Sequence, residues 1–508
     1  MVINKQNIRL IFGLKLRQLR MQRGLSFAQL SKAAGVSVSY LNEIEKGKKY
    51  PKTDKIISLA EALGVSYDQL VSLKLNKKLS PIAELLNSGI LDSLPLEMFG
   101  LEPSTLLELI STAPSKINAF ISTILKIARN YEMSQENFFL AALRSYQEMH
   151  NNYFEELEEQ VAAFTKEYGL DTHPPITHQS LREVLIQHFG YTIDSHSLDQ
   201  YEELRTFRSV YVNKSRHLFI NPRLTDRQQA FLLGKELAFH YLNLTNRPET
   251  SSMFEVKNFD EVLNNFKASY FSVALLLNRE EMVNDLETIF SHKHWDSEGF
   301  TELMEKYQAS PEMFISRITN LLPRFFEIDN FFFLRFNDFL DADVEHFHIT
   351  KELHLNQIHR PHRNELNEHY CRRWVSIRIL QSLKQAQVHH NLETDYLMDV
   401  QKSRYMGTKS EYFCISVARP NSPTPHSNVS VTLGVFVDAT SKRKMKFLDH
   451  PDILVREVSE TCERCALTDC TERVAPPTVI ERKQDQKQIK ARLRELKHAM
   501  LDPATEPK

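Results

Sequence analysis

Glycine is scarce in this sequence, with 13 among 508 residues. Because glycine supplies the left-handed backbone of many tight turns, this scarcity favours a helix-rich architecture over a β-sandwich or barrel. No apolar run approaches the roughly 20 residues that a membrane-spanning helix needs, and the N-terminal segment has no long apolar core like that of a signal peptide. We therefore expect a cytoplasmic protein with no membrane partner.

Cysteine is also rare: the chain has five, three of them between Cys462 and Cys470. This distribution does not match the disulfide framework of a small secreted protein. Hydrophobic residues make up 42% and charged residues 25%, a globular mixture that excludes a disordered chain. The length exceeds what one hydrophobic core serves, so we expect a small domain joined to larger ones.

The chain also lacks a large net charge, which is −2 overall, but its charges are unevenly distributed. Residues 1–75 contain 13 Lys or Arg and 5 Asp or Glu, a balance of +8 that leaves −10 for the remainder. A basic segment on an acidic body predicts a nucleic-acid surface at the N-terminal end.

Residues 1–75 show the caps and apolar spacing of five short helices. Ser26 and Ser37 are N-cap residues, and Gly35 supplies the turn between the second and third helices. That order predicts a helix-turn-helix. The expected helices run from about Ile8 to Gln22, Phe27 to Ala34, Val38 to about Lys46, from Pro51 and Lys52 onward, and Tyr67 to Leu73.

The run from LRQLRMQRGLS to EALGVSYDQLV resembles the Cro and repressor (XRE) family in helix lengths, turn glycines, inner apolar positions and the IEKGKKYP exit. The resemblance implies that a homodimer binds a double-stranded DNA operator with the third helix in the major groove. Phe27 stands where phage repressors often have a phosphate-clamping Gln, so Gln29 is a candidate substitute. The alternative is a helical bundle that contacts proteins. The expected DNA-binding residues are Gln29, Ser37, Val38, Ser39, Tyr40, Asn42, Lys46 and Lys48.

Further along, the segments FRSVYVN and HLFINP have strand character, and a helix beginning near Thr225 carries GKELAFHYL. This order is similar to the ImmA/IrrE domain, whose zinc peptidases carry HExxH on that helix. Here Lys235 and Phe239 replace the two histidines, Glu236 keeps the glutamate, and His240 is one position out of register. Zinc needs converging lone-pair donors, so we interpret the helix as a scaffold without metal or catalytic residues, with Glu236 as an exposed charge and His240 at an edge. A metallopeptidase or anti-repressor acting on a partner protein is the alternative.

The C-terminal third contains strand-like segments, EYFCISVARP and NVSVTLGVFVDA, and a motif with three closely spaced thiols. Histidines are frequent around residues 346–371, without a convincing ligand spacing. Cys462, Cys465 and Cys470 have the spacing C-x2-C-x4-C, which leaves three interpretations open: a zinc site, a reduced structural or redox-sensing cluster, and an inert turn. For zinc, the fourth ligand would come from His450, Asp469 or Cys414.

Taken together, the helix-turn-helix, the altered peptidase helix and the cysteine motif are similar to the short-chain fatty-acyl regulators of bacterial acetate and propionate metabolism. This resemblance implies a body that senses an acyl-CoA effector. The fold class that we predict is a mainly α helix-turn-helix bundle followed by helix-rich α+β ImmA/IrrE-like and sensor domains. The expected domains are residues 1–75 (DNA binding), 76–160 (helical spacer or dimerisation), 161–345 (ImmA/IrrE-like), 346–480 (α+β sensor) and 481–508 (charged helical tail).

Overall fold

The computed structural model describes residues 5–72, 135–250, 256, 258–341, 344–355, 368–389, 396–421, 424 and 427–501. The chain divides into two compact units, residues 1–146 with 256–262, and residues 147–255 with 263–508. None of the helices within the described residues is both long enough and apolar enough to cross a bilayer.

The first unit contains the five helices that the sequence predicts. Their buried faces form one apolar core that includes Leu16, Leu30, Leu41 and Leu59. Ser26 and Ser37 cap the second and third helices as expected, each accepting a hydrogen bond from a backbone N–H three residues later. The helices are α1 (Lys5–Gln22), α2 (Phe27–Ala34), α3 (Val38–Glu45), α4 (Thr53–Leu63) and α5 (Tyr67–Val71).

Two contacts fix α1 against α3. Arg20 of α1 forms a two-pronged ion pair with the buried Glu45 carboxylate, at 2.6 and 2.8 Å. About two turns earlier, Gly13 passes so close to α3 that a Cβ there would lie 2.3 Å from the Ile44 carbonyl oxygen. Only a residue without a side chain fits this crossing, so the orientation of α3 is set by α1.

Most of the expected spacer, residues 76–134, lies outside the described residues. The described part comprises α10 (Gln135–Met149) and the start of α11. The remaining helices before the larger sheet are α11 (Glu155–Glu167), α12 (His178–Phe189), α13 (Asp226–Tyr241), α14 (Phe259–Leu276), α15 (Arg279–Ser291), α16 (Ser297–Lys306) and α17 (Pro311–Phe326).

A small three-stranded sheet accompanies these helices. Its strands are β1 (Thr192–Asp194), β2 (Ser209–Val212) and β3 (His217–Ile220), and their order is β1-β3-β2. Strands β2 and β3 lie within the two segments that the sequence predicts, and α13 begins near Thr225 as expected, with Thr225 as its N-cap. Three short 3-10 helices, η2 (Ser197–Gln200), η3 (Glu202–Leu204) and η4 (Asn213–Ser215), connect the strands.

A six-stranded sheet with the order β5-β4-β8-β7-β6-β9 forms the second layer of the body; its strands are antiparallel except for the parallel pair β6 and β9. Both faces of β7 and β8 are buried, which requires cover on each side. Helix α18 (Val375–Val388) contacts β6, β7 and β8, and α17 contacts β8. The strands are β4 (Phe331–Asp341), β5 (Val344–Leu355), β6 (Leu397–Tyr405), β7 (Glu411–Pro420), β8 (Asn428–Phe436) and β9 (Val455–Val458).

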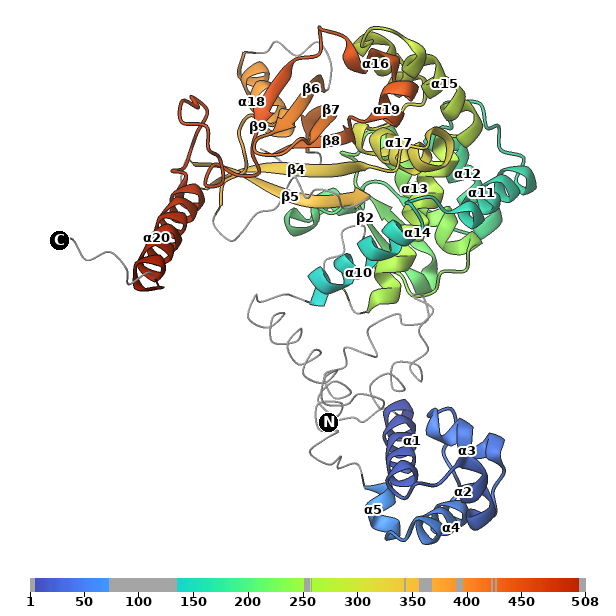
Figure 1. Ribbon diagram of the computed structural model, residues 1–508. Helices are drawn as coiled ribbons and strands as arrows, with labels where there is room; N and C mark the ends of the chain where they lie inside the picture. The colour runs from blue at the N-terminus through green and yellow to red at the C-terminus, as the bar shows by residue number, and fades with distance from the viewer. Residues whose placement is uncertain are drawn as a thin grey trace, which may run out of the picture. The chain divides into compact units, whose positions relative to one another are not determined.

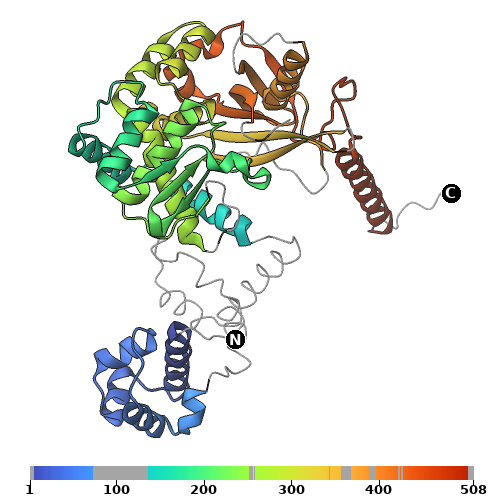
Figure 2. The ribbon, with the colours of Figure 1, turned by 180° about the vertical axis from the view of Figure 1, so that it is seen from behind.

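Figures 1 and 2 show helices α11 to α17 gathered on one side of the second unit and the larger sheet with α18 on the other. Strand β7 coincides with the expected segment EYFCISVARP, and β8 covers most of the other. The five-helix bundle of residues 5–72, called the head below, is followed by the helix-rich α+β layers of the second unit, called the body below. This order confirms the predicted fold class.

The long β4–β5 hairpin is the feature that the sequence analysis missed. The expected domain boundary between residues 345 and 346 falls inside this hairpin, whose strands pair from Phe331 and Leu355 to Asp341 and Val344. Since paired strands share one sheet, β4 belongs with the later module rather than with the ImmA/IrrE-like one. The chain then continues through α19 (Ala439–Lys444), η5 (Lys446–Asp449) and α20 (Thr478–Leu501), the expected charged tail.

Candidate functional site

Helix α3 presents a polar surface opposite its buried face. Leu41, Ile44 and Glu45 point inward, whereas Val38 and Ser39 are exposed and Asn42 is half-buried. At 3.6 residues per turn, positions 38, 39, 42 and 46 lie within an arc of about 100°. The exposed arc therefore carries four of the expected DNA-binding residues, Val38, Ser39, Asn42 and Lys46.

The remaining expected contacts surround this arc. Lys48 is exposed just beyond α3, and Tyr40 is half-buried. Ser37 is exposed, but its hydroxyl accepts a hydrogen bond from the Tyr40 N–H at 3.1 Å. The side-chain carbonyl of Gln29, on α2, accepts the Ser26 N–H at 2.8 Å, so its amide NH2 is the part left for another acceptor.

Phe27 has a structural role where phage repressors often carry a polar clamp. Its ring lies under the Arg20 guanidinium, 4.1 Å from the ring centroid to the guanidinium carbon. Arg20 in turn holds Glu45 of α3. The aromatic residue therefore supports the ion pair that orients α3, by a cation–π contact.

Helix α13 carries the altered peptidase motif in a buried setting. Glu236 is 4% exposed, which corrects the expectation of an exposed charge. Its carboxylate accepts hydrogen bonds from the Tyr191 hydroxyl at 2.9 Å and from Arg247 at 2.6 and 2.8 Å. The carboxylate of the motif is thus engaged by a cation from the same chain.

Arg247 occupies a sandwich of aromatic rings beside that carboxylate. Its guanidinium carbon lies 4.0 Å from the ring centroids of both Tyr211 and Phe239. Phe239 stands where the zinc peptidases have their second histidine, so the aromatic substitution stacks on the cation. Sequence reasoning missed Arg247 because nothing in its spacing marks it as a partner of Glu236.

The other two positions of the motif offer no converging ligands either. Lys235 donates to the Asn265 side chain at 2.7 Å, and burial lowers the pKa of its ammonium to about 7. His240 is half-buried, with Nε2 3.4 Å from the Tyr211 hydroxyl. Burial and the nearby Arg247 charge lower the pKa of His240, which favours the neutral ring.

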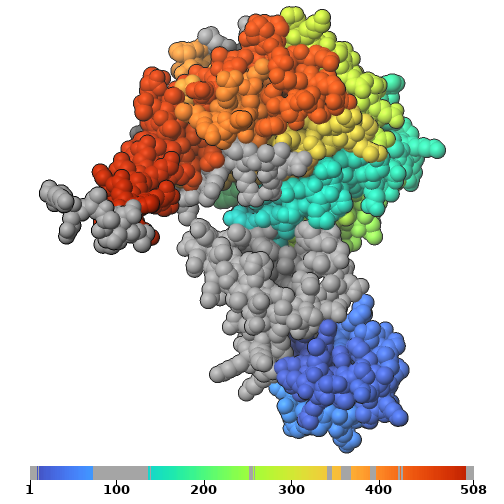
Figure 3. All heavy atoms as spheres, in the orientation of Figure 1, coloured from blue at the N-terminus to red at the C-terminus, as the bar shows by residue number. Residues whose placement is uncertain are grey.

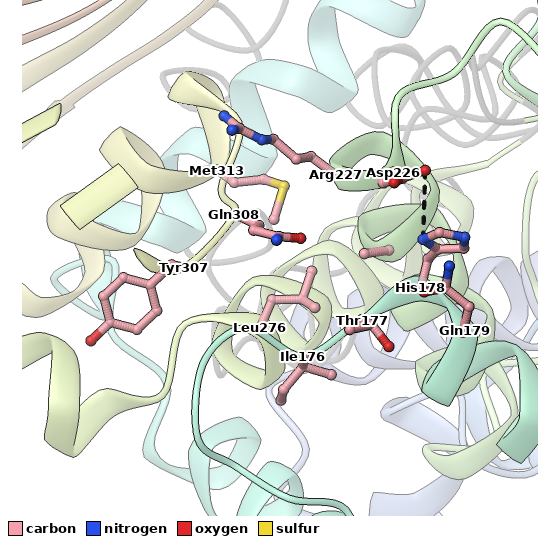
Figure 4. Close-up of a pocket in the computed structure, with 11 residues that line it drawn as sticks. Ile176, Thr177, His178, Gln179, Asp226, Arg227, Leu276, Tyr307, Gln308 and Met313 are labelled. Carbon is pink, nitrogen blue, oxygen red and sulfur yellow. Dashed lines mark ion pairs between the residues drawn. The ribbon is translucent and has the colours of Figure 1, made fainter. Parts of the chain in front are cut away.

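A pocket opens beside the first turn of α13 (Figure 4). Asp226 and His178 face each other across 3.7 Å, while Arg227 bonds to Glu305. The volume of the pocket is about 40 Å³, well below the roughly 300–1,000 Å³ of small-molecule sites. The lining residues are Ile176, Thr177, His178, Gln179, Asp226, Arg227, Ala230, Leu276, Tyr307, Gln308 and Met313.

The cysteine motif lies in a loop that one arginine holds together. Cys462 and Cys465 are buried and Cys470 is half-buried. Arg473 donates to the backbone carbonyls of Cys462, Cys465 and Leu467, at 2.6 to 3.1 Å. Throughout the described part of the chain, these thiols are not among the groups of three ligands whose atoms approach within 4.8 Å. The zinc interpretation thus gains no converging ligand set and stays a prediction.

The proposed fourth ligands have other surroundings. The Cys414 thiol points to the Ser403 hydroxyl at 3.6 Å, and burial raises its pKa to about 12. His450 lies beside Asp452, with 3.3 Å between Nδ1 and the carboxylate. Cys371, which the zinc interpretation did not include, is buried, and burial raises the pKa of its thiol to about 11.

Comparison with known proteins agrees with both motifs. A helix-turn-helix domain model matches residues 11–73, and an IrrE N-terminal-like domain model matches residues 187–319. The HTH-type transcriptional regulator DdrOP3 of Deinococcus deserti is 37% identical over 57 residues, which are 11% of this chain and 44% of that protein. The uncharacterized HTH-type transcriptional regulator YazB of Bacillus subtilis is 38% identical over 60 residues, 12% of this chain and 87% of that protein.

A solved structure of a Mycobacterium tuberculosis transcriptional regulator is also similar, with a TM-score of 0.46 and 19% identity, over 66% of this chain and 92% of that one. The matched residues make up less than half of the length of DdrOP3, whereas they cover almost the whole length of YazB. Through this head, with its caps, its core and its exposed α3 surface, the chain belongs to the helix-turn-helix transcriptional regulators and is a DNA-binding protein of that family.

Proposed function

We propose that α3 reads the operator through Val38, Ser39 and Asn42, and that Lys46 and Lys48 contact phosphates. The observation that carries this proposal is the exposed arc of α3, polar and basic, on a helix held rigidly by the buried Arg20–Glu45 pair. A rigid helix with short polar side chains suits direct readout of base edges in the major groove.

The operator-bound species in this proposal is a homodimer. A recognition helix of 8 residues spans only a few base pairs, so two heads on two half-sites provide the specificity that one lacks. Helix α20 supports dimerisation: its residues 481–498 are exposed throughout, and Figure 3 shows its atoms on the surface. Ile489, Leu493 and Leu496 follow a four-three spacing, are 51 to 59% exposed and suit a two-helix seam with a second copy.

The body in this proposal is a sensor without peptidase activity. Arg247 already neutralises Glu236, and Lys235 and Phe239 cannot bind zinc. The alternative, a metallopeptidase or anti-repressor, draws on the IrrE-like match alone. Purified protein incubated with casein or a partner repressor, with and without zinc, distinguishes the two: cleavage lost in Glu236→Gln would favour the peptidase.

A short-chain acyl-CoA is the effector class that we propose, on the resemblance to fatty-acyl regulators. The pocket beside α13 holds only about 40 Å³, against roughly 300–1,000 Å³ for typical ligand sites, so this proposal rests on the resemblance and not on that pocket. A ligand that binds the folded body raises its melting temperature by mass action and changes operator affinity through coupling, typically about 5- to 150-fold.

Genomic footprinting followed by gel-shift titration tests the proposal. Full-length protein should protect two half-sites about one helical turn apart, and acetyl- or propionyl-CoA should shift both the operator affinity and the melting temperature. Leu493→Glu should weaken operator binding by the dimer but leave the melting of the head unchanged. A panel of acyl-CoAs and free acids that changes neither quantity would leave a pure dimerisation scaffold as the better account of the body.

A further inference from the structure

Two loops far apart in sequence bring three metal-ligating side chains together. His294 lies between α15 and α16, whereas His450 and Asp452 lie between η5 and β9. One ligand atom from each residue lies within 4.8 Å of the other two, and no other group of three His, Cys, Asp or Glu does so in the part of the chain that the structure describes. We propose that these residues form a divalent transition-metal site.

The spacing of the ligand atoms suits a bound ion. His450 Nδ1 and Asp452 Oδ2 are 3.3 Å apart. Ligand bonds of about 2.0–2.1 Å in tetrahedral zinc geometry place neighbouring ligand atoms about 3.3 Å from each other. The two imidazole rings meet edge to face, with centroids 4.1 Å apart, so their nitrogens are close to one another. His450 Nδ1 also accepts the Asp452 backbone N–H at 3.3 Å, so an ion bound at this nitrogen would replace that hydrogen bond, whereas an ion bound at Nε2 would leave it in place.

Aromatic packing positions the two loops before any ion binds. Trp295, the residue after His294, contacts Phe447 of η5 at 5.3 Å between ring centroids. Both rings also contact Phe413 of β7, at 5.5 and 5.3 Å. Each ligand-bearing loop is therefore anchored in the same cluster, and a supported ligand set of this kind is what metal binding requires.

The ligand types indicate the class of metal. Two imidazoles and one carboxylate suit Zn²⁺, Co²⁺, Ni²⁺ or Cu²⁺, whereas Mg²⁺ and Ca²⁺ prefer oxygen ligands throughout. His294 is exposed, and the side chain of Asp452 is 81% exposed. Water or another small ligand completes the coordination of such an open site, which makes the ion exchangeable rather than permanently buried.

The site joins two parts of the body that the sequence keeps 156 positions apart, counted from His294 to His450. His294 belongs to the segment that the IrrE N-terminal-like model matches, and the other two ligands lie just before β9 of the six-stranded sheet. An ion bound to all three would tie these parts together, so the stability of the body would depend on the concentration of the free ion.

A zinc titration of the full-length, chelator-treated protein tests this site. The wild type should bind one equivalent of Zn²⁺ more than His294→Ala, measured by competition with a chromophoric chelator, and zinc should raise the melting temperature of the wild type only. Asp452→Asn, which keeps the shape of the side chain, should weaken the affinity for that zinc ion by tenfold or more. His196→Ala, which removes an exposed histidine elsewhere, is the matched control and should bind as the wild type does.

A second variant distinguishes zinc bound at the His294 site from zinc bound at the cysteine motif. Cys470→Ser should leave the equivalent assigned to His294 unchanged. Equal stoichiometry and affinity in the wild type, His294→Ala and Asp452→Asn would overturn the proposal and leave a hydrogen-bonded cluster only. Because both altered side chains are exposed, the metal-free variants should melt with the metal-free wild type, which confirms that they fold.

Discussion

Replacing Arg247 with Met tests whether the cation beside Glu236 sustains the fold of the body. The Arg247 and Glu236 side chains are 11% and 5% exposed. The replacement removes the hydrogen bonds at 2.6 and 2.8 Å and leaves Glu236 with the Tyr191 hydroxyl as a donor. Removing one partner of a buried ion pair costs about 3–5 kcal/mol, because the remaining charge is uncompensated.

This cost should be visible in calorimetry. The body has roughly 350 residues, and at about 2.1 cal/mol/K of unfolding entropy per residue a loss of 3–5 kcal/mol should lower the body transition of Arg247→Met by roughly 4 to 7 °C. Arg223→Met is the matched control, because it breaks an exposed pair with Asp199 whose side chains are 49% and 39% exposed. Exposed pairs of this kind contribute about 0–1 kcal/mol, so the control should melt within about 1 °C of the wild type.

A double variant separates the charge from the packing. Arg247→Met with Glu236→Gln removes the uncompensated charge, so it should be more stable than Arg247→Met alone. Equal melting of the single and double variants would show that the loss comes from the aromatic sandwich rather than from the carboxylate. An Arg247→Met protein as stable as the control would refute the idea that Arg247 compensates Glu236.

Three further predictions concern the head and α13. Gly13→Ala should destabilise the head by about 1–3 kcal/mol in urea melts, because the new Cβ meets the Ile44 carbonyl oxygen. Gly24→Ala has nothing within 4 Å of its Cβ but a φ of +66°, so it should lose about 1–2 kcal/mol through backbone strain alone. Lys235→Met should stabilise the body at pH 7 by about 2–4 kcal/mol, because the folded protein lowers the pKa of the Lys235 ammonium to about 7, below the ordinary 10.5. The wild type should therefore gain stability as the pH rises from 7 to 10, and the stabilities of the two proteins should become equal near pH 10. Asn42→Ala should reduce the preference for the operator sequence by about 1–3 kcal/mol, whereas Lys46→Ala should weaken binding to all DNA sequences and reduce the salt dependence of binding. An unchanged sequence preference in Asn42→Ala would contradict the role of α3.

The head was predictable because its signals are local. Caps such as Ser37 act within one turn, and the apolar positions of each helix repeat with the helical period, so the bounds of α2 agree with the prediction at both ends. Strands β2 and β7 were predictable for the same reason, through β-branched and aromatic runs.

The partners of the site residues were not predictable in this way. Arg247 reaches Glu236 from a loop, and His294 meets His450 because Trp295 and Phe447 pack together. These contacts depend on how distant segments fold against each other, which neither spacing nor periodicity encodes. The β4–β5 hairpin was missed because β4 begins with four consecutive apolar residues, Phe331 to Leu334, rather than with an alternating run, and a register shift between Arg335 and Phe336 interrupts its pairing with β5.

The substitutions on α13 form one coherent change rather than separate losses. A metal ion would have to be acquired from solution, whereas Arg247 is part of the chain and is present whenever the body folds. Phe239 provides a surface for that cation, and Tyr191 completes the hydrogen bonds of Glu236. Retaining a buried glutamate without such a cation would cost several kcal/mol, so the loss of the zinc ligands and the presence of Arg247 depend on each other. If α13 binds no zinc, as we propose, any metal dependence of this regulator comes from sites elsewhere in the chain.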